Sequence, residues 1–352
     1  MASSIGYSNN ITHCKFFLTQ AVRIAYSLGL HRQIPKNRTR ATKSCNDGLR
    51  ANVWNILICY DITEVYYRNS EYSPTCVSSG IISNNGYIPL NLSYLHKFEL
   101  PREKVPNESM FWYQKRSPSS SPNTNSPQDD HYNSTIDEVQ PKCLYLFRYI
   151  IEKFVLPISY HIRKISTPNS NNDYLNPEAL GNQIKLVNLS LDSAYVFGLK
   201  HYSGLSYNYQ GDQLAPTIIT PFVWGFVLML KSFSIIVNSL RPHCNLNASS
   251  PLPPNQLKNL LLSSKQLAHI TSLYPPNFVS FRYIYIIRAA TILFQEYPYL
   301  PLSAQPELRN SLKIIYEQIY LSSNNYAPFK DLLPKLKNLG LKLGFDISAE
   351  IE

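Results

Sequence analysis

The sequence predicts an all-α protein, an irregular multi-helix bundle with one polar insertion, on three observations. Apolar residues recur at helical spacing in several separate segments, whereas the apolar and polar alternation typical of half-buried strands does not appear. Glycine is scarce, with 12 residues in 352, which disfavours the glycine-rich turns of a large nucleotide-binding α/β enzyme. The 25 prolines indicate many loops and helix boundaries between the apolar segments.

The first predicted helix covers residues 12–30 and ends at a glycine. Its core-facing side is expected to consist of Phe17, Ala21, Ile24 and Leu28, at spacings of four, three and four. Gly29 stands where a helix end needs a residue in the left-handed conformation, and the side chain of Leu30 is expected to fold back onto the last turn. His31 and Arg32 follow, and their positive charge suits a helix C-terminus.

A second predicted helix, residues 48–68, is apolar on most sides and includes Trp54, so we expect it to be buried among other helices. Asp61 is conspicuous within this helix because a buried carboxylate needs a partner. The expected partner is Arg23 or Arg32 from the first helix, or His31. The pattern favours a structural ion pair over a catalytic acid.

The chain divides into three parts. Residues 1–105 hold the first two helices and an irregular, proline-punctuated loop, and residues 141–345 hold the later helices of the same domain. Between them, residues 106–140 form an insertion that is dominated by Ser, Pro and Asn from Ser117 onward. Such a composition cannot bury enough apolar surface to compensate for ordering, so we expect a disordered insertion.

Helical apolar stripes continue through the last part of the chain. The predicted helices run from Cys143 to Phe154, from Asn176-Pro177 onward, through the window 218–230, and over 256–273, 277–297, 305–322 and 328–340. The window 218–230 is the most hydrophobic, but its thirteen residues are too few to span a bilayer. We therefore expect a buried core helix there and no membrane partner; membrane association through 218–239 is the alternative.

Charge and cysteine content narrow the function classes. The net charge of +10 is compatible with an anionic partner, but the basic residues are scattered apart from a cluster between Arg32 and Lys43. That cluster is interpreted as a solvated loop, with a nuclear-import or phosphate-binding patch as the alternative. The six cysteines show no Cys-x-x-Cys spacing, which predicts reduced thiols in an intracellular protein and no metal site. No catalytic motif is present, and we expect no enzymatic activity.

Several segments together resemble one protein family. The similarity is carried by Ala21, Arg23, Ala25, Leu28, Gly29, Leu30, His31 and Arg32, then by Trp54 and Asp61, and finally by Arg241 and Pro242 after Leu240. These residues resemble the fungal-specific transcription factor domain, the regulatory middle region of fungal binuclear zinc-cluster transcription factors. The resemblance covers roughly residues 12–320, and the first motif is its most specific part.

The resemblance implies a nuclear protein that regulates transcription by RNA polymerase II. In such proteins a zinc cluster held by six closely spaced cysteines contacts DNA, and this chain has no such cluster. We therefore expect a truncated member, or a short regulator without its own DNA-binding module, with no cofactor in the chain itself. We expect contact with DNA only through the missing module. The other expected partners are the transcription machinery or a small effector, and the chain could also form a homodimer. The alternative is a helical protein-interaction scaffold of unrelated function.

Overall fold

The computed structural model describes ten parts of the chain, and these parts are almost entirely helical. They comprise residues 11–30, 50, 53–57, 128–155, 157–159, 161–162, 177–241, 251–273, 283–323 and 327–342. Of this described portion, 89% is helical and none is strand. The predicted all-α fold is therefore confirmed.

The helix bounds agree closely with the sequence-based expectations in the last part of the chain. The helices are α2 (Ile11–Ser27), α7 (Gln128–Ile150), the π-helix η2 (Ile151–Val155), α9 (Pro177–Asn208), α10 (Leu214–Asn238), α11 (Pro254–Leu273), α12 (Tyr283–Glu296), the short 3-10 helix η3 (Tyr297–Tyr299), α13 (Gln305–Ser322) and α14 (Ala327–Lys342). Residue 50 and residues 53–57 are also helical and lie within the second predicted helix. The start of α9 at Pro177 is confirmed, as proline suits the first turn of a helix.

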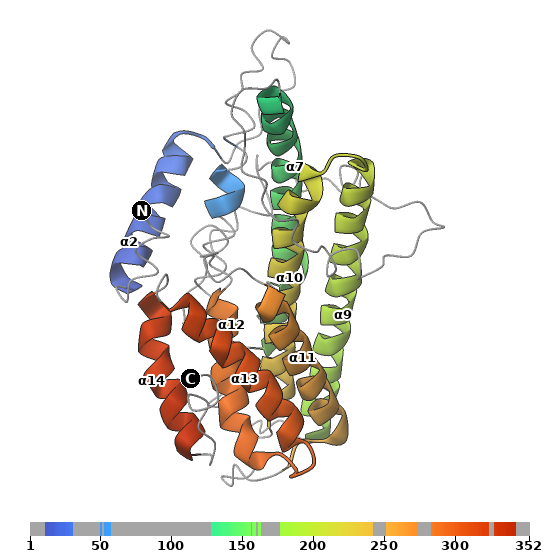
Figure 1. Ribbon diagram of the computed structural model, residues 1–352, viewed down its shortest axis with the longest axis vertical. Helices are drawn as coiled ribbons and strands as arrows, with labels where there is room; N and C mark the ends of the chain where they lie inside the picture. Colours follow the sequence, from blue (N-terminus) through green and yellow to red (C-terminus); the bar gives the residue numbers. More distant parts are fainter. Residues whose placement is uncertain are drawn as a thin grey trace.

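Helix α10 lies at the centre of the bundle (Figure 1). It packs against α7 and α9 on one side and against α11 and α12 on the other. Helix α13 covers α11 and also contacts α12 and α14, so the C-terminal helices form a second group on α10. One hydrophobic core cluster runs from Leu18 in α2 to Leu336 in α14.

Two predictions about helix extent were wrong. The expected disorder over 106–140 fails for residues 128–140, which belong to α7. The fully buried Val139 and Cys143 anchor this part of the helix to the core. The helix continues through Pro141. Residues 106–127 lie outside the described residues.

Helix α10 is also longer than predicted, so the length argument against a membrane span was wrong. It has 25 residues, and it is the one helix in the described portion that is long and apolar enough to cross a bilayer. Length and composition alone are weak evidence for a membrane span, because a buried core helix meets the same criteria. In the structure 67% of its most apolar stretch is buried inside the protein.

Helices α9 and α10 approach closely at Gly198. A Cβ atom placed there would lie 2.7 Å from Cε2 of Phe226 and 3.1 Å from Cδ1 of Ile150. The Phe226 ring is itself fixed, because it is fully buried and stacks on Tyr202 at 5.4 Å between ring centroids. Only glycine therefore fits at this crossing.

Candidate functional site

The predicted end of the first helix is confirmed. Gly29 has a φ of +65°, in the left-handed region. The N–H of Leu30 donates to the C=O of Ala25, and the N–H of Gly29 donates to the C=O of Tyr26, both at 2.9 Å. This pair of bonds is the Schellman arrangement, in which a glycine reverses the chain and the helix carbonyls keep their donors.

The predicted core-facing side of this helix was wrong. Among residues 17–30, whose side chains the structure describes, Leu18, Val22 and Ala25 are buried, whereas Ile24 is 57% exposed and Leu28 is 63% exposed. Phe17 and Ala21 are half-buried and Arg23 is exposed. Apolar residues occupy two adjoining sides of α2, so their spacing alone could not show which side meets the core.

The second helical segment docks on α2 through an aromatic contact. Trp54 is fully buried, and its ring meets that of Tyr26 edge-on with centroids 5.5 Å apart. The expectation of burial holds for Trp54 but is wrong for Val53 and Ile56, which are exposed. The structure therefore brings Trp54 together with the last turn of α2.

An arginine that the sequence analysis missed holds the end of α2. Nη2 of Arg50 donates a hydrogen bond of 3.0 Å to the C=O of Gly29. This is the position where a cation is favourable, because the helix C-terminus carries partial negative charge. His31, Arg32 and Asp61, the residues predicted for this role and for its ion pair, lie outside the described residues.

A buried arginine connects the second helical segment to the core. Nη1 of Arg148 donates to Oδ1 of Asn55 at 2.7 Å, and its Nε donates to Oε1 of Glu152 at 2.7 Å. The side chains of Arg148 and Glu152 are 1% and 4% exposed. Glu152 lies in the π-helix η2, directly after the regular turns of α7. We call Asn55, Arg148 and Glu152 the buried polar triad.

The sequence contained one signal for this triad that was not used. Arg148 and Glu152 stand four residues apart inside the apolar stripe from Cys143 to Phe154. Opposite charges at this spacing lie on one side of a helix and can pair, and within an apolar stripe that pair must be buried. Asn55 gives no comparable signal, because it is 93 residues away from Arg148.

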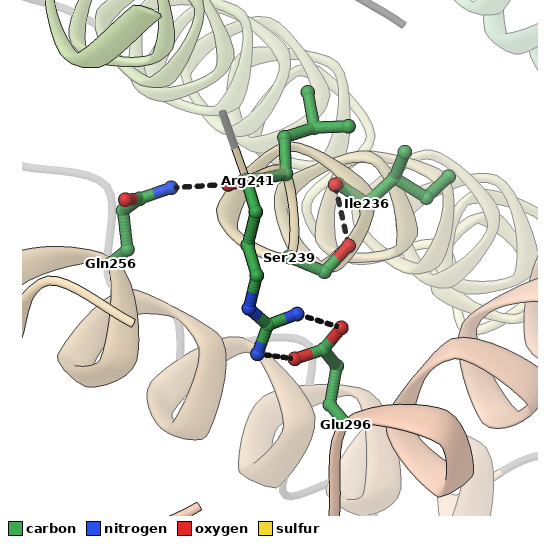
Figure 2. Close-up of polar contacts among 6 residues, drawn as sticks. Ile236, Ser239, Arg241, Gln256 and Glu296 are labelled. Atoms are coloured by element: carbon green, nitrogen blue, oxygen red, sulfur yellow. Dashed lines mark hydrogen bonds and ion pairs between the residues drawn. The ribbon is translucent and has the colours of Figure 1, made fainter. Parts of the chain in front are cut away.

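Arg241, from the last part of the family resemblance, belongs to a different site (Figure 2). Its guanidinium makes a two-pronged ion pair with Glu296, with Nη1–Oε1 at 2.7 Å and Nη2–Oε2 at 2.6 Å. It also lies over the ring of Tyr299 at 5.4 Å from the centroid. Beside it, Nε2 of Gln256 donates to the C=O of Leu240 at 3.1 Å. These contacts join the end of α10 to α11 and α12; Pro242 lies outside the described residues.

A smaller polar cluster joins the start of the buried part of α7 to the end of α9. Lys142 pairs with Glu138 at 2.6 Å and donates a hydrogen bond to the hydroxyl of Tyr209. The hydrogen bond from Lys142 lowers the pKa of Glu138 below its usual value. Burial raises the pKa of Tyr209.

One open groove lies between α9 and the segment 153–161. It encloses about 380 Å³. Residues from both walls line it, namely Lys153, Phe154, Pro157, Ile158, His161, Gln183, Leu186, Val187, Leu189, Ser190 and Ser193. In the described residues, no group of three or more His, Cys, Asp or Glu side chains could hold a metal ion.

Comparisons of the chain with protein-family models, with curated proteins and with solved structures give no match.

Proposed function

We propose that this chain is the regulatory domain of a fungal transcription factor and controls transcription by RNA polymerase II in the nucleus. The main support is the motif from Ala21 to Leu30, whose sequence resembles that family. In this fold the motif forms a well-defined helix end at Gly29, and Trp54, a second residue of the resemblance, contacts its last turn. The role is regulatory rather than enzymatic.

A tethering experiment tests this proposal. The whole chain is fused to an unrelated DNA-binding domain in yeast and placed upstream of a minimal reporter promoter. We expect reporter transcription to change several-fold in either direction relative to the DNA-binding domain alone, and a fluorescent fusion to be nuclear. A stable fusion that leaves the reporter unchanged and stays outside the nucleus would overturn the proposal.

The proposal also specifies how the chain meets DNA. In the proposed family, base-specific contact comes from the zinc cluster, so the purified chain should bind DNA only through its net positive charge. Such binding should be indifferent to sequence and should weaken steeply as salt is raised. A salt-resistant, sequence-selective shift of promoter DNA by the purified chain would contradict this expectation.

A helical protein-interaction scaffold is the second candidate function. The observation that favours it is the exposed apolar side chain of Leu186, which lines the groove beside α9. A scaffold would bind its partner equally well whether or not it were brought to a promoter. Affinity purification of the chain together with the tethering reporter separates the two candidates, because only the regulator changes transcription.

A further inference from the structure

Helix α9 has an apolar surface on the side that faces away from the core. Its core side consists of residues such as Ile184, Val187 and Leu191, which are all buried. Leu186, Leu189 and Val196 are 64%, 54% and 62% exposed. Their spacings of three and seven place them on one side of the helix, and at 1.5 Å per residue they span about 15 Å. We call these three residues the α9 stripe.

The α9 stripe continues into the groove. Leu186 and Leu189 line the groove, whereas Val196 lies three residues, less than one turn, beyond Ser193, the last α9 residue of its lining. The floor includes Val187 and Ile158, which are buried and apolar. An apolar surface of this kind at the edge of a groove is typical of an interaction site. The groove wall and the stripe together extend along α9 from Gln183 to Val196, about 20 Å, which favours an elongated occupant over a compact small molecule.

The charge around the groove indicates the chemistry of that occupant. Lys153 and His161 line the groove, and no carboxylate is among its lining residues. On α9 itself, Lys185 and Lys200 are balanced by Glu178 and Asp192, so the helix adds no net charge. The positive character therefore comes from Lys153, and an anionic partner is favoured.

We propose that the α9 stripe and the groove bind an acidic amphipathic helix of a partner protein. Apolar residues at positions i, i+3 or i+4, and i+7 of that helix match a stripe of this length. Its carboxylates, on the flank of the apolar side, face Lys153 and His161. This inference goes beyond the transcriptional role, because the binding is a property of the purified chain.

Fluorescence anisotropy with designed peptides tests the inference. The probe is a labelled helical peptide of about 18 residues, or five turns, with leucines along one side and glutamates on the flanks. Two comparison peptides have the same composition in scrambled order, or lysine in place of every glutamate. The full chain should bind the probe at least tenfold more tightly than either comparison peptide.

Substitutions on the protein localise the binding, each with a matched control. Leu189→Ser should weaken binding about tenfold, whereas Leu302→Ser, at another exposed leucine, should leave it unchanged. Lys153→Glu should also weaken binding, most strongly at low salt, whereas Lys337→Glu on α14 should not. Because all four side chains are exposed, urea unfolding should show that the variants stay folded.

Three results would overturn the inference. They are equal binding of the scrambled peptide, equal binding of the lysine peptide, and equal effects of Leu189→Ser and Leu302→Ser. The first would show that an amphipathic helix is not required, the second that charge plays no part, and the third that the α9 stripe is not the site.

Discussion

Arg148 and Arg241 both join segments that lie far apart in the chain, but their surroundings differ. Arg148 is 1% exposed and shares its donors between a carboxylate and an amide. Arg241 is 17% exposed and gives two parallel hydrogen bonds to Glu296. Water reaches the second site, whereas the first depends wholly on protein groups.

The comparison shows that the loss of an arginine–glutamate ion pair should affect stability more where the pair is fully buried than where solvent reaches it. Oε2 of Glu152 has no hydrogen-bond partner among the described residues, so its charge is stabilised mainly through Arg148. Removal of one partner from a buried pair leaves an uncompensated charge away from water, which is more costly than the loss of the pair itself. At Arg241, solvent can replace part of the lost interaction.

The largest expected effect is at Arg148. Arg148→Ala should lower the free energy of unfolding by about 4 kcal/mol, because Glu152 is left buried and unpaired. Urea unfolding monitored by circular dichroism measures the loss, with Arg309→Ala on exposed α13 surface as the control. The double variant Arg148→Met with Glu152→Leu should recover most of that stability. A double variant as unstable as the single one would show that packing, not charge, explains the loss.

A substitution at Gly198 tests how much a purely steric change in the core lowers the free energy of unfolding. Gly198→Ala should cost about 2 kcal/mol, because its methyl group would meet the fixed Phe226 ring. Gly181 belongs to the same helix but has no atom within 4 Å of such a methyl group. Gly181→Ala should therefore stabilise the protein by about 0.5–1 kcal/mol. If the two substitutions gave the same change in unfolding free energy, the close approach of α9 and α10 would be refuted.

A smaller loss is expected at Arg241. Arg241→Ala should cost about 1.5 kcal/mol, the contribution of hydrogen bonds to a charged group that solvent partly replaces. Arg241→Lys should recover little of it, because an ammonium cannot make the two parallel bonds to Glu296. The urea midpoint provides the measurement. A loss as large as that of Arg148→Ala would remove the distinction between the two sites.

Gly29 tests whether α2 unfolds together with the rest of the protein, which it contacts through Tyr26 and Trp54. Gly29→Ala should cost about 1 kcal/mol, because alanine is strained at a φ of +65°. Gly211→Ala, at a φ of +105° in the exposed turn between α9 and α10, is the matched substitution outside α2. If α2 belongs to the cooperative unit, both variants should shift the single unfolding transition. A separate early transition for Gly29→Ala alone would show that α2 unfolds independently.

The smallest effect concerns the ion pair between the exposed Glu138 and the half-buried Lys142, and it depends on pH. The pKa of Glu138 is lowered from 4.5 by the hydrogen bond from Lys142, so the charged form stabilises the fold above that value. This contribution is lost as the pH falls through the lowered pKa. Glu138→Gln should therefore cost about 0.3 kcal/mol at neutral pH, and this difference should shrink as the pH falls through the lowered pKa. An undiminished difference at low pH would contradict the assignment.

Local features of this fold were predictable from the sequence, and long-range ones were not. The end of α2 at Gly29 and the bounds of α13 depend on residues within a few positions of each other, and both agree with prediction. The buried side of α2 depends on which helices surround it, and that prediction was wrong. The contact between Asn55 and Arg148 joins residues 93 positions apart, for which one sequence contains no pattern.

The same distinction applies to the candidate sites. Arg241 was identified through its resemblance to a family, but its partner Glu296 was not, because the two are 55 positions apart. The α9 stripe could not be recognised from spacing, since Leu186 and Leu189 alternate with buried apolar residues on a helix that is apolar on two sides. Only the packing of α9 against α7 and α10 determines which of those sides stays exposed.

The central position of α10 has a consequence during protein synthesis. Two of the helices that cover it, α11 and α12, are translated after it, so the part of its apolar surface that they cover stays open until they have left the ribosome. At 5–20 residues per second, the roughly 60 residues from the end of α10 to the end of α12 take about 3–12 seconds to synthesise. During that interval α10 is a 25-residue apolar segment of the kind that chaperones bind and membrane-insertion machinery recognises.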